Sequence, residues 1–302
     1  MKLSDLATGE KGLSFIIPAY NEEKGITDTL RRLLTTLSTL GMPHEIVFVN
    51  DGSTDKTKEL AAQFNDVQII NHPINIGYGN ALKSGIKYAK YEWIGIVDAD
   101  GSYPIEDISK LVVEMEKGYD MVIGSRSNIQ NIDKFSKKLF RWAFKLLVQR
   151  TISGDIEDAN SGFRLFRKDM LIRLTPFLCG TFSFTTSLTI LASGMHSFIK
   201  YVPIQYSERT GKSKVKHLRD ALRTIQFIVQ GITFFNPIKF FLMLAVAMII
   251  IVCIPAMFLA LFRMHTLSLY YMIFGTAVAL MMGMGVLGDI IRISADKRGT
   301  KT

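Results

Sequence analysis

Short apolar runs alternate with helical segments between residues 13 and 123. We expect strands at residues 13–17, 45–49, 67–70, 93–97 and 120–123, and helices at residues 27–40, 79–89 and 105–117. The first of these helices carries Leu30, Leu33 and Leu37 on one face. Strands that alternate with helices in this way are typical of a mostly parallel sheet covered on both faces. The pattern therefore predicts an α/β domain with a Rossmann-like sheet.

Three further elements are expected around this sheet. Ser53 or Thr54 is expected to cap the helix after the second strand. Residues 177–195 carry no charge but many serines and threonines, so we expect a buried helix or a cleft wall there. Residues 198–206 predict a late strand.

Two stretches near the end of the sequence, residues 240–262 and 267–288, contain no charged side chain. Each is long enough for a helix that crosses a hydrocarbon core of roughly 30 Å, which needs about 20 residues. Residues 263–266 leave room only for a tight turn between them. We therefore expect a transmembrane hairpin.

Basic side chains gather on the flanks of this hairpin. They lie before the first stretch (Arg209, Lys212, Lys214, Lys216, Arg219, Arg223 and Lys239) and after the second (Arg292, Lys297, Arg298 and Lys301). Because cytoplasmic loops carry an excess of Lys and Arg, both ends of the hairpin are expected in the cytoplasm. The catalytic domain is then expected on the cytoplasmic face of the cell membrane.

The sequence divides into three parts on this interpretation: a catalytic domain (1–208), a basic amphipathic juxtamembrane segment (209–236), and the hairpin with a short cytoplasmic tail (237–302). Residues 127–154 are also basic, with apolar side chains at helical spacing. They fit an ordinary surface helix or a membrane-facing segment that meets an anionic lipid, and both interpretations stay open.

Charge and cysteine content narrow the class of protein. The net charge of +9 is concentrated beside the first apolar stretch, which favours lipid headgroups over nucleic acid as the partner. The chain has two cysteines, so no disulfide framework is expected, and its five scattered histidines do not suggest a zinc site. The first 12 residues contain no apolar stretch, so we expect no signal peptide there.

Polar motifs follow three successive strands of the expected sheet. They are Pro-Ala-Tyr-Asn-Glu at residues 18–22, Asn-Asp-Gly-Ser-Thr-Asp at residues 50–55 and Asp-Ala-Asp at residues 98–100. Ligands of such sheets bind beyond the carboxyl ends of the strands, so these turns are expected to face one crevice. The carboxylates of Asp98 and Asp100 can share a hard cation, Mg²⁺ or Mn²⁺, together with substrate phosphates.

Taken in order, these motifs resemble those of family 2 inverting glycosyltransferases of the GT-A fold. Within that family the sequence is most similar to the group of dolichol-phosphate mannose synthases and polyprenyl-phosphate glycosyltransferases. The resemblance continues through residues 75–81, 124–126, 158–164 and 201–214, and it covers nearly the whole chain from residue 13 to the hairpin. Asn50 and Ser102 depart from it, where relatives often carry aspartate and, in mannose transferases, glutamine.

The resemblance implies roles for individual residues. Pro18, Tyr20, Glu22, Asp51 and Asp98 match nucleotide-binding positions, and Asp98 and Asp100 match the metal site. The catalytic positions are Asp100, Arg126 and Asp158, with Asp158 either a base or an orienting group. The acceptor phosphate is expected to meet Arg126, Lys137, Arg141 and Arg164, although Arg164 could instead form a structural ion pair with Asp158.

The implied activity is transfer of a hexose-type sugar from a UDP- or GDP-sugar to a polyprenyl phosphate such as undecaprenyl or dolichyl phosphate. The sequence leaves open the sugar, the base, the length of the lipid and the oligomeric state, which could be a homo-oligomer. The alternatives are a family 2 transferase acting on a polysaccharide or glycolipid, and a non-catalytic membrane scaffold. A processive synthase is disfavoured because neither Trp93 nor Trp142 lies in a Gln-x-x-Arg-Trp motif.

Overall fold

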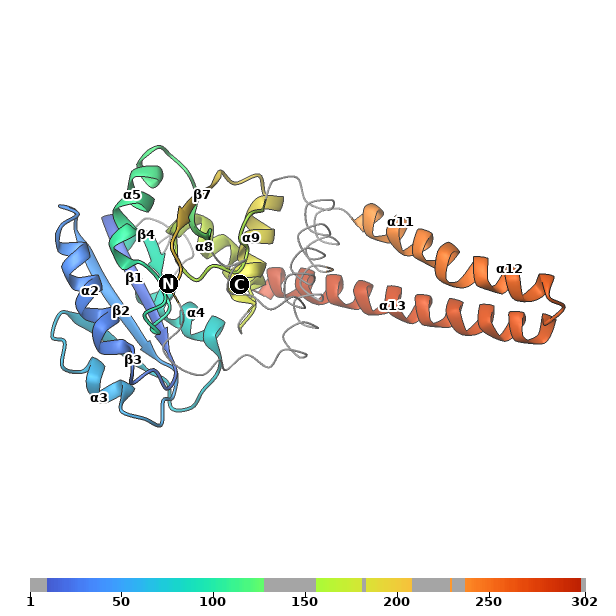
Figure 1. Ribbon diagram of the computed structural model, residues 1–302, viewed down its shortest axis with the longest axis horizontal. Coiled ribbons are helices and arrows are strands. Elements are labelled where there is room, and N and C mark those ends of the chain that lie inside the picture. Colours follow the sequence, from blue (N-terminus) through green and yellow to red (C-terminus); the bar gives the residue numbers. More distant parts are fainter. Residues whose placement is uncertain (1–9, 128–155, 181–182, 208–228, 230–236, 300–302) are drawn as a thin grey trace. The chain divides into compact units, whose positions relative to one another are not determined.

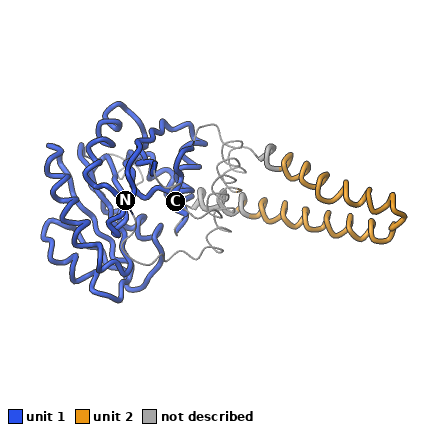
Figure 2. The backbone as a smooth tube through the Cα atoms, viewed as in Figure 1, with its two compact units in different colours: residues 1–224 blue, residues 225–302 orange. Residues whose placement is uncertain are grey.

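The computed structural model describes residues 10–127, 156–180, 183–207, 229 and 237–299. The chain divides into two compact units, residues 1–224 and residues 225–302 (Figure 2). The basic segments expected over residues 127–154 and 209–236 lie outside the described residues, except at residues 127 and 229. The expected domain boundaries at residues 208 and 236 fall in the same gaps.

A mixed sheet forms the centre of the first unit (Figure 1). Its strands are β1 (Glu10–Ala19), β2 (His44–Asn50), β3 (Val67–Asn71), β4 (Tyr91–Ile96), β5 (Met121–Arg126), β6 (Arg164–Arg167) and β7 (Ile199–Ile204). Their order in the sheet is β3-β2-β1-β4-β6-β5-β7. The neighbouring strands run parallel except at β6, which is antiparallel to both β4 and β5. The mostly parallel sheet expected from the sequence is confirmed.

Helices cover both faces of this sheet. They are α2 (Ile26–Ser38), α3 (Thr57–Ala61), α4 (Tyr78–Tyr88), η1 (Ile105–Asp107), α5 (Ile108–Glu116), α8 (Lys168–Leu174), η2 (Thr175–Phe177) and α9 (Phe184–Gly194). On one face Phe15 and Ile17 of β1 join the buried side chains of α2 and α5 in a single core. On the other face Ile16 meets α4, where a Cβ added to Gly85 would lie 2.5 Å from the Ile16 side chain. Burial on both faces explains why the sequence of β1 is a continuous apolar run rather than an alternating one.

Three local features differ from the sequence-based expectation. Strand β6 and helix α8 were not expected; the strand is only four residues long and begins at the last residue of the polar motif 158–164. Ser53 and Thr54 do not cap α3, which begins after Lys56. They bond to Asn21 instead: Ser53 Oγ accepts from the Asn21 amide at 3.0 Å, and the Thr54 amide donates to Asn21 Oδ1 at 2.8 Å. The loops that follow β1 and β2 thus bond to each other, and α3 has no side-chain cap.

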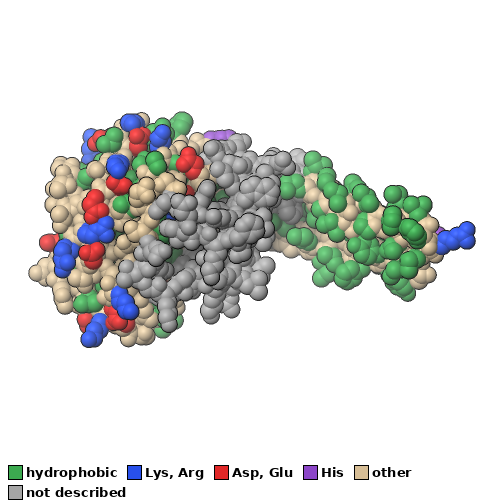
Figure 3. Space-filling model, viewed as in Figure 1, with side chains coloured by type: hydrophobic (Ala, Val, Ile, Leu, Met, Phe, Trp, Pro, Cys, Tyr) green, Lys and Arg blue, Asp and Glu red, His purple; other side chains and the backbone are tan. Residues whose placement is uncertain are grey.

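The second unit contains the two apolar stretches as helices. The first comprises α11 (Pro237–Met248), a π-helical turn η3 (Ile249–Cys253) and α12 (Ile254–Leu261), and the second is α13 (His265–Gly299). Phe241–Leu261 and His265–Gly288 are long and apolar enough to cross a membrane, which agrees with the expected hairpin. Hydrophobic side chains cover the face of this unit seen in Figure 3.

Hydrogen bonds join these helices. Pro255 has no N–H to donate to the carbonyl of Ile251, four residues earlier, and the π-helical turn lies at this point. The Tyr271 hydroxyl of α13 donates to that carbonyl at 3.0 Å. One helical turn further on, Ser268 Oγ donates to the carbonyl of Ala256 at 2.7 Å. Such bonds satisfy backbone and hydroxyl groups that water would otherwise serve.

Candidate active site

The sheet topology brings distant motifs to one edge. β1 and β2 end side by side, with Ala19 paired to Asn50. Because β6 runs antiparallel, its first residue, Arg164, lies opposite Ile96 near the end of β4. The loop over residues 158–162 therefore arrives at the carboxyl ends of β4 and β5, next to the Asp98 turn. This is the edge where parallel α/β sheets bind their ligands.

The first two loops of this edge are bonded to each other. Asn21, which adopts a left-handed conformation with φ of 53°, is held by Ser53 and Thr54 as described above. The Glu22 amide donates to Thr57 Oγ1 at 2.8 Å, and the Asp51 amide donates to the carbonyl of Ala19 at 2.8 Å. The expected nucleotide-binding residues Tyr20 and Glu22 are partly exposed here, whereas Pro18 is buried in β1.

Asp51 is buried and anchors the loop after β3. Its carboxylate accepts hydrogen bonds from the amides of Ile76 and Gly77 at 3.0 and 2.9 Å, and it contacts His72 Nδ1 at 2.8 Å. His72 Nε2 lies 2.9 Å from Ser84 Oγ. Gly77, with φ of 102°, supplies the left-handed turn at which α4 begins. Asp51 thus fixes the loop after β3, at the sheet edge where the sequence predicts the nucleotide.

Asp98 and Asp100 follow β4, and each has a hydroxyl partner. The Tyr78 hydroxyl donates to Asp98 Oδ1 at 2.8 Å, and burial together with the Asp98 charge raises the pKa of Tyr78. Asp100 is 4% exposed, and its Oδ1 accepts from the Ser102 amide at 3.1 Å and from Ser102 Oγ at 2.5 Å. The main chain beneath them is fixed by α2, because Thr29 Oγ1 donates to the carbonyl of Ala99.

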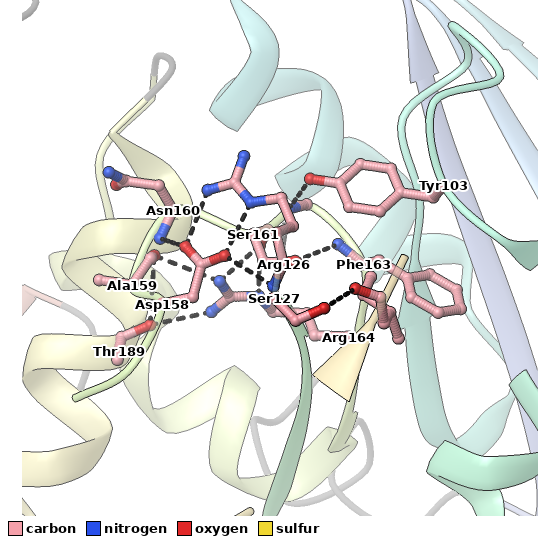
Figure 4. A network of polar contacts seen from close by, with 12 residues as sticks. Tyr103, Arg126, Ser127, Asp158, Ala159, Asn160, Ser161, Phe163, Arg164 and Thr189 are labelled. Carbon is pink, nitrogen blue, oxygen red and sulfur yellow. Dashed lines mark hydrogen bonds and ion pairs between the residues drawn. The ribbon is translucent and has the colours of Figure 1, made fainter. Parts of the chain in front are cut away.

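Arg126 and Asp158 form a two-pronged ion pair (Figure 4). Arg126 Nε and Nη2 donate to Asp158 Oδ2 and Oδ1 at 2.7 and 2.8 Å, and the side chains are only 10% and 8% exposed. Burial opposes ionisation of Asp158, but the hydrogen bonds and charge of Arg126 outweigh it and lower the pKa of the carboxyl. Asp158 also accepts from the amide of Asn160 at 3.2 Å.

Arg164 lies apart from this pair, in the core beneath the loop (Figure 4). It is fully buried and donates to the carbonyls of Ser161 and Ala159. Its other bonds reach α9, at the carbonyl of Thr185 and at Thr189 Oγ1. The ion-pair partner of Asp158 is Arg126 rather than Arg164. We therefore assign Arg164 to holding the 158–162 loop against α9, and not to the acceptor phosphate. The other two residues expected at that phosphate, Lys137 and Arg141, lie outside the described residues.

The structure adds contacts among three aromatic residues to which the sequence analysis assigned no role. The Gly162 amide donates to the hydroxyl of Tyr103 at 2.8 Å, and the rings of Tyr103 and Phe163 stack with centroids 5.7 Å apart. Tyr206 packs edge-on against Tyr103, and its ring lies 5.4 Å from the guanidinium carbon of Arg126. These three aromatic residues come from separate segments, so no sequence spacing relates them.

The comparison with known protein families decides the classification. A model of glycosyl transferase family 2 matches residues 14–175, which contain the sheet edge described above. The chain belongs to glycosyl transferase family 2.

Relatives within the family carry a more specific name. The chain is 32% identical over 215 residues to undecaprenyl-phosphate 4-deoxy-4-formamido-L-arabinose transferases of Salmonella typhimurium and Salmonella newport. Each match covers 69% of this chain and 64% of the relative. The matched region therefore spans just under two thirds of the length of these relatives.

Solved structures confirm the GT-A fold of the family. Glucosyl-3-phosphoglycerate synthase from Mycobacterium tuberculosis, in complex with Mn²⁺, uridine diphosphate and phosphoglyceric acid, has a TM-score of 0.59 at 17% identity. The match covers 76% of this chain and 82% of that chain. The same enzyme with Mg²⁺ and uridine diphosphate has a TM-score of 0.57 at 16% identity, over 76% of this chain and 83% of that chain.

Proposed function

We propose that the chain transfers a sugar from a nucleotide-diphosphate donor to the phosphate of a polyprenyl lipid. The observation that carries the proposal is the meeting of two unlike groups at one sheet edge: the acidic turn at Asp98 and Asp100, and the Arg126–Asp158 pair. Membership of glycosyl transferase family 2 supports a nucleotide-sugar donor. The names of the 32% identical relatives support a polyprenyl phosphate acceptor.

The carboxylates of Asp98 and Asp100 would hold the divalent cation. Among the described residues no group of three His, Cys, Asp or Glu side chains could hold a metal by itself. Mg²⁺ and Mn²⁺ can bind through one or two carboxylates and complete their coordination with substrate phosphates, so the two aspartates are a sufficient contribution from the protein. Gly162 fits this arrangement, because a Cβ there would come within 2.6 Å of Asp98 Oδ2. When bound, the cation would neutralise charge on the leaving diphosphate.

Arg126 would receive the acceptor phosphate. A phosphate monoester has its second pKa near 6, so its oxygen is largely ionised at neutral pH and needs little help from a base. It needs cationic groups that offset repulsion from the donor diphosphate. A guanidinium has five N–H donors, and the pair with Asp158 engages two of them. On this assignment Asp158 orients Arg126, which the lowered pKa of its carboxyl supports.

The second unit would anchor the enzyme as a membrane hairpin. Only 11% of the most apolar window of Phe241–Leu261 is buried, and none of that of His265–Gly288. Core helices of a water-soluble protein are buried instead, so these exposed apolar surfaces favour a lipid environment. By the excess of Lys and Arg in cytoplasmic loops, the flanking basic residues support a cytoplasmic location for both ends of the hairpin and for the catalytic unit.

The test is a transfer assay on the full chain in detergent. We expect it to transfer radiolabel to undecaprenyl or dolichyl phosphate from one member of a panel of UDP- and GDP-sugars with Mg²⁺ or Mn²⁺. A thermal-shift panel identifies the donor first, since a ligand that binds the native state raises the melting temperature. A chain that binds a nucleotide sugar but transfers it only to a polysaccharide or a glycolipid would contradict the proposed acceptor.

Asp100→Asn tests the proposed metal site in the same assay. The substitution keeps the size of the side chain but removes its charge, so transfer should fall by at least 100-fold, a loss of roughly 3 kcal/mol of transition-state stabilisation. The matched control is Asp28→Asn on α2, whose side chain is 61% exposed. It should leave the rate within twofold. Substantial activity in Asp100→Asn would refute the metal assignment.

A further inference from the structure

Tyr206 touches the acceptor half of the site through its ring. It follows β7 by two residues, and β7 pairs with β5 up to the register of Arg126 and Ile204. The ring centroid lies 5.4 Å from the guanidinium carbon of Arg126, a distance at which ring and cation attract. Tyr103 packs edge-on against the same ring at 5.1 Å and is itself 2% exposed. The Tyr206 ring therefore packs against a buried residue of the core on one side.

The hydroxyl of Tyr206 reaches the donor half. Burial raises the pKa of Tyr206, and Ser102 and the Asp100 charge are among the groups that act on it, so the hydroxyl lies near both. Ser102 is fully buried, and its Oγ and amide both donate to Asp100 Oδ1. A main-chain hydrogen bond also joins the two segments: the Ser207 amide, one residue after Tyr206, donates to the carbonyl of Ser102 at 2.9 Å. Ser102 thus links the carboxylate of Asp100 to the end of β7.

We propose that Tyr206 is a positioning residue that joins the two halves of the site. Its ring sets the orientation of the Arg126 guanidinium toward the acceptor phosphate, and its hydroxyl fixes Ser102 and hence the Asp100 carboxylate. The inference rests on the proposed function, because it assigns Arg126 to the acceptor and Asp100 to the donor complex. It goes beyond that function by placing one side chain in control of both.

Two substitutions separate the two contacts. Tyr206→Phe keeps the ring and removes the hydroxyl, whereas Tyr206→Leu removes both. In Tyr206→Phe we expect the Kd for the donor nucleotide with Mn²⁺ to rise about fivefold and the KM for polyprenyl phosphate to stay within twofold. In Tyr206→Leu we expect the acceptor KM to rise about tenfold as well. Tyr88→Leu, which replaces an exposed tyrosine of α4, is the control and should leave both constants unchanged.

The measurements are nucleotide titration calorimetry, acceptor kinetics and melting temperature, each on the full chain in detergent. The inference holds if the acceptor KM responds to Leu but not to Phe while the nucleotide Kd responds to both. It is overturned if both variants lower only the melting temperature, or if both lower kcat with the two constants unchanged. The nucleotide titration needs no acceptor. If wild type binds nucleotide but transfers nothing to polyprenyl phosphate, the proposed acceptor fails, while an unchanged Kd in Tyr206→Phe still overturns the inference separately.

Discussion

At the scale of single residues, two arginines with the same expected role have opposite environments. The sequence motifs place Arg126 and Arg164 at the acceptor phosphate, since each belongs to a motif of the resembled family. In the folded chain Arg126 lies at the sheet edge with Asp158 as its partner, whereas Arg164 is fully buried among carbonyls. A buried charge needs partners that satisfy its donors, and Arg164 has them in two separate segments. Full burial therefore argues against Arg164 as a substrate contact and leaves Arg126 as the arginine proposed for that role.

Asp158→Asn should destabilise the protein in a pH-dependent way. The variant leaves the Arg126 charge buried without its partner, which costs roughly 3 kcal/mol. Because Arg126 lowers the pKa of Asp158, the stabilisation is fully present above the unfolded-state pKa of about 4 and is lost as pH falls through the lower folded-state value. Thermal melting from pH 7 to pH 3 should show the difference from wild type shrinking at the acidic end.

The control for this experiment is Asp28→Asn, which removes an exposed i,i+4 pair with Arg32. Such pairs contribute little, so its melting temperature should stay close to that of wild type at every pH. An Asp158→Asn variant as stable as wild type at pH 7 would contradict the assigned ion pair.

At the scale of elements, the antiparallel strand β6 assembles the site. Its direction carries the 158–162 loop to the ends of β4 and β5, where Gly162 packs directly against Asp98. Gly162 does not adopt a left-handed conformation, so its role is close approach rather than backbone freedom. The Tyr103 hydroxyl, which accepts from the Gly162 amide, holds the loop at that distance.

Gly162→Ala should therefore weaken binding of the divalent cation. The new Cβ would lie 2.6 and 2.8 Å from the two oxygens of Asp98, so the carboxylate or the loop must shift. Overpacking of this kind costs about 1–3 kcal/mol. We expect at least a tenfold loss of Mn²⁺ affinity, measured by electron paramagnetic resonance with the nucleotide present. Gly285→Ala in α13, where nothing lies within 4 Å, should bind Mn²⁺ as wild type does.

At the scale of the whole molecule, the chain combines two units with different surfaces. The first has a core closed by helices on both faces of a sheet, and the second exposes large apolar side chains along most of its length. Exposure of the first surface to water is favourable, whereas exposure of the large apolar surface of the second unit is unfavourable. This contrast is the physical basis for treating the second unit as a membrane anchor.

Cysteine accessibility tests the proposed topology. In a chain with Cys179 and Cys253 replaced by alanine, Arg263→Cys at the hairpin turn should react with a membrane-impermeant maleimide on intact cells. Lys58→Cys on the exposed face of α3 should react only after the cells are opened. The reverse pattern would invert the orientation, and reaction of both sites in intact cells would exclude the hairpin as a membrane span.

The sequence alone determined the features that repeat locally. Apolar periodicity located β1 to β5, α2, α4, α5 and both apolar helices, because burial of one face or of both follows from residue spacing. The strand-end motifs also singled out Asp98 and Asp100, whereas Arg126 and Asp158 came from the resemblance to family 2. What sequence resemblance supplied in addition was the family.

The tertiary structure alone decided how these residues are paired. Four features depend on segments that are far apart in the chain. They are the short strand β6, the bonding of Ser53 and Thr54 to Asn21 in place of a helix cap, the burial of Arg164, and the contact between Tyr206 and Arg126. Local propensity carries no information about such partners, since hydrogen bonds and ring contacts form wherever the sheet brings groups together. The sequence names the chemical groups, and the order of strands in the sheet selects their partners.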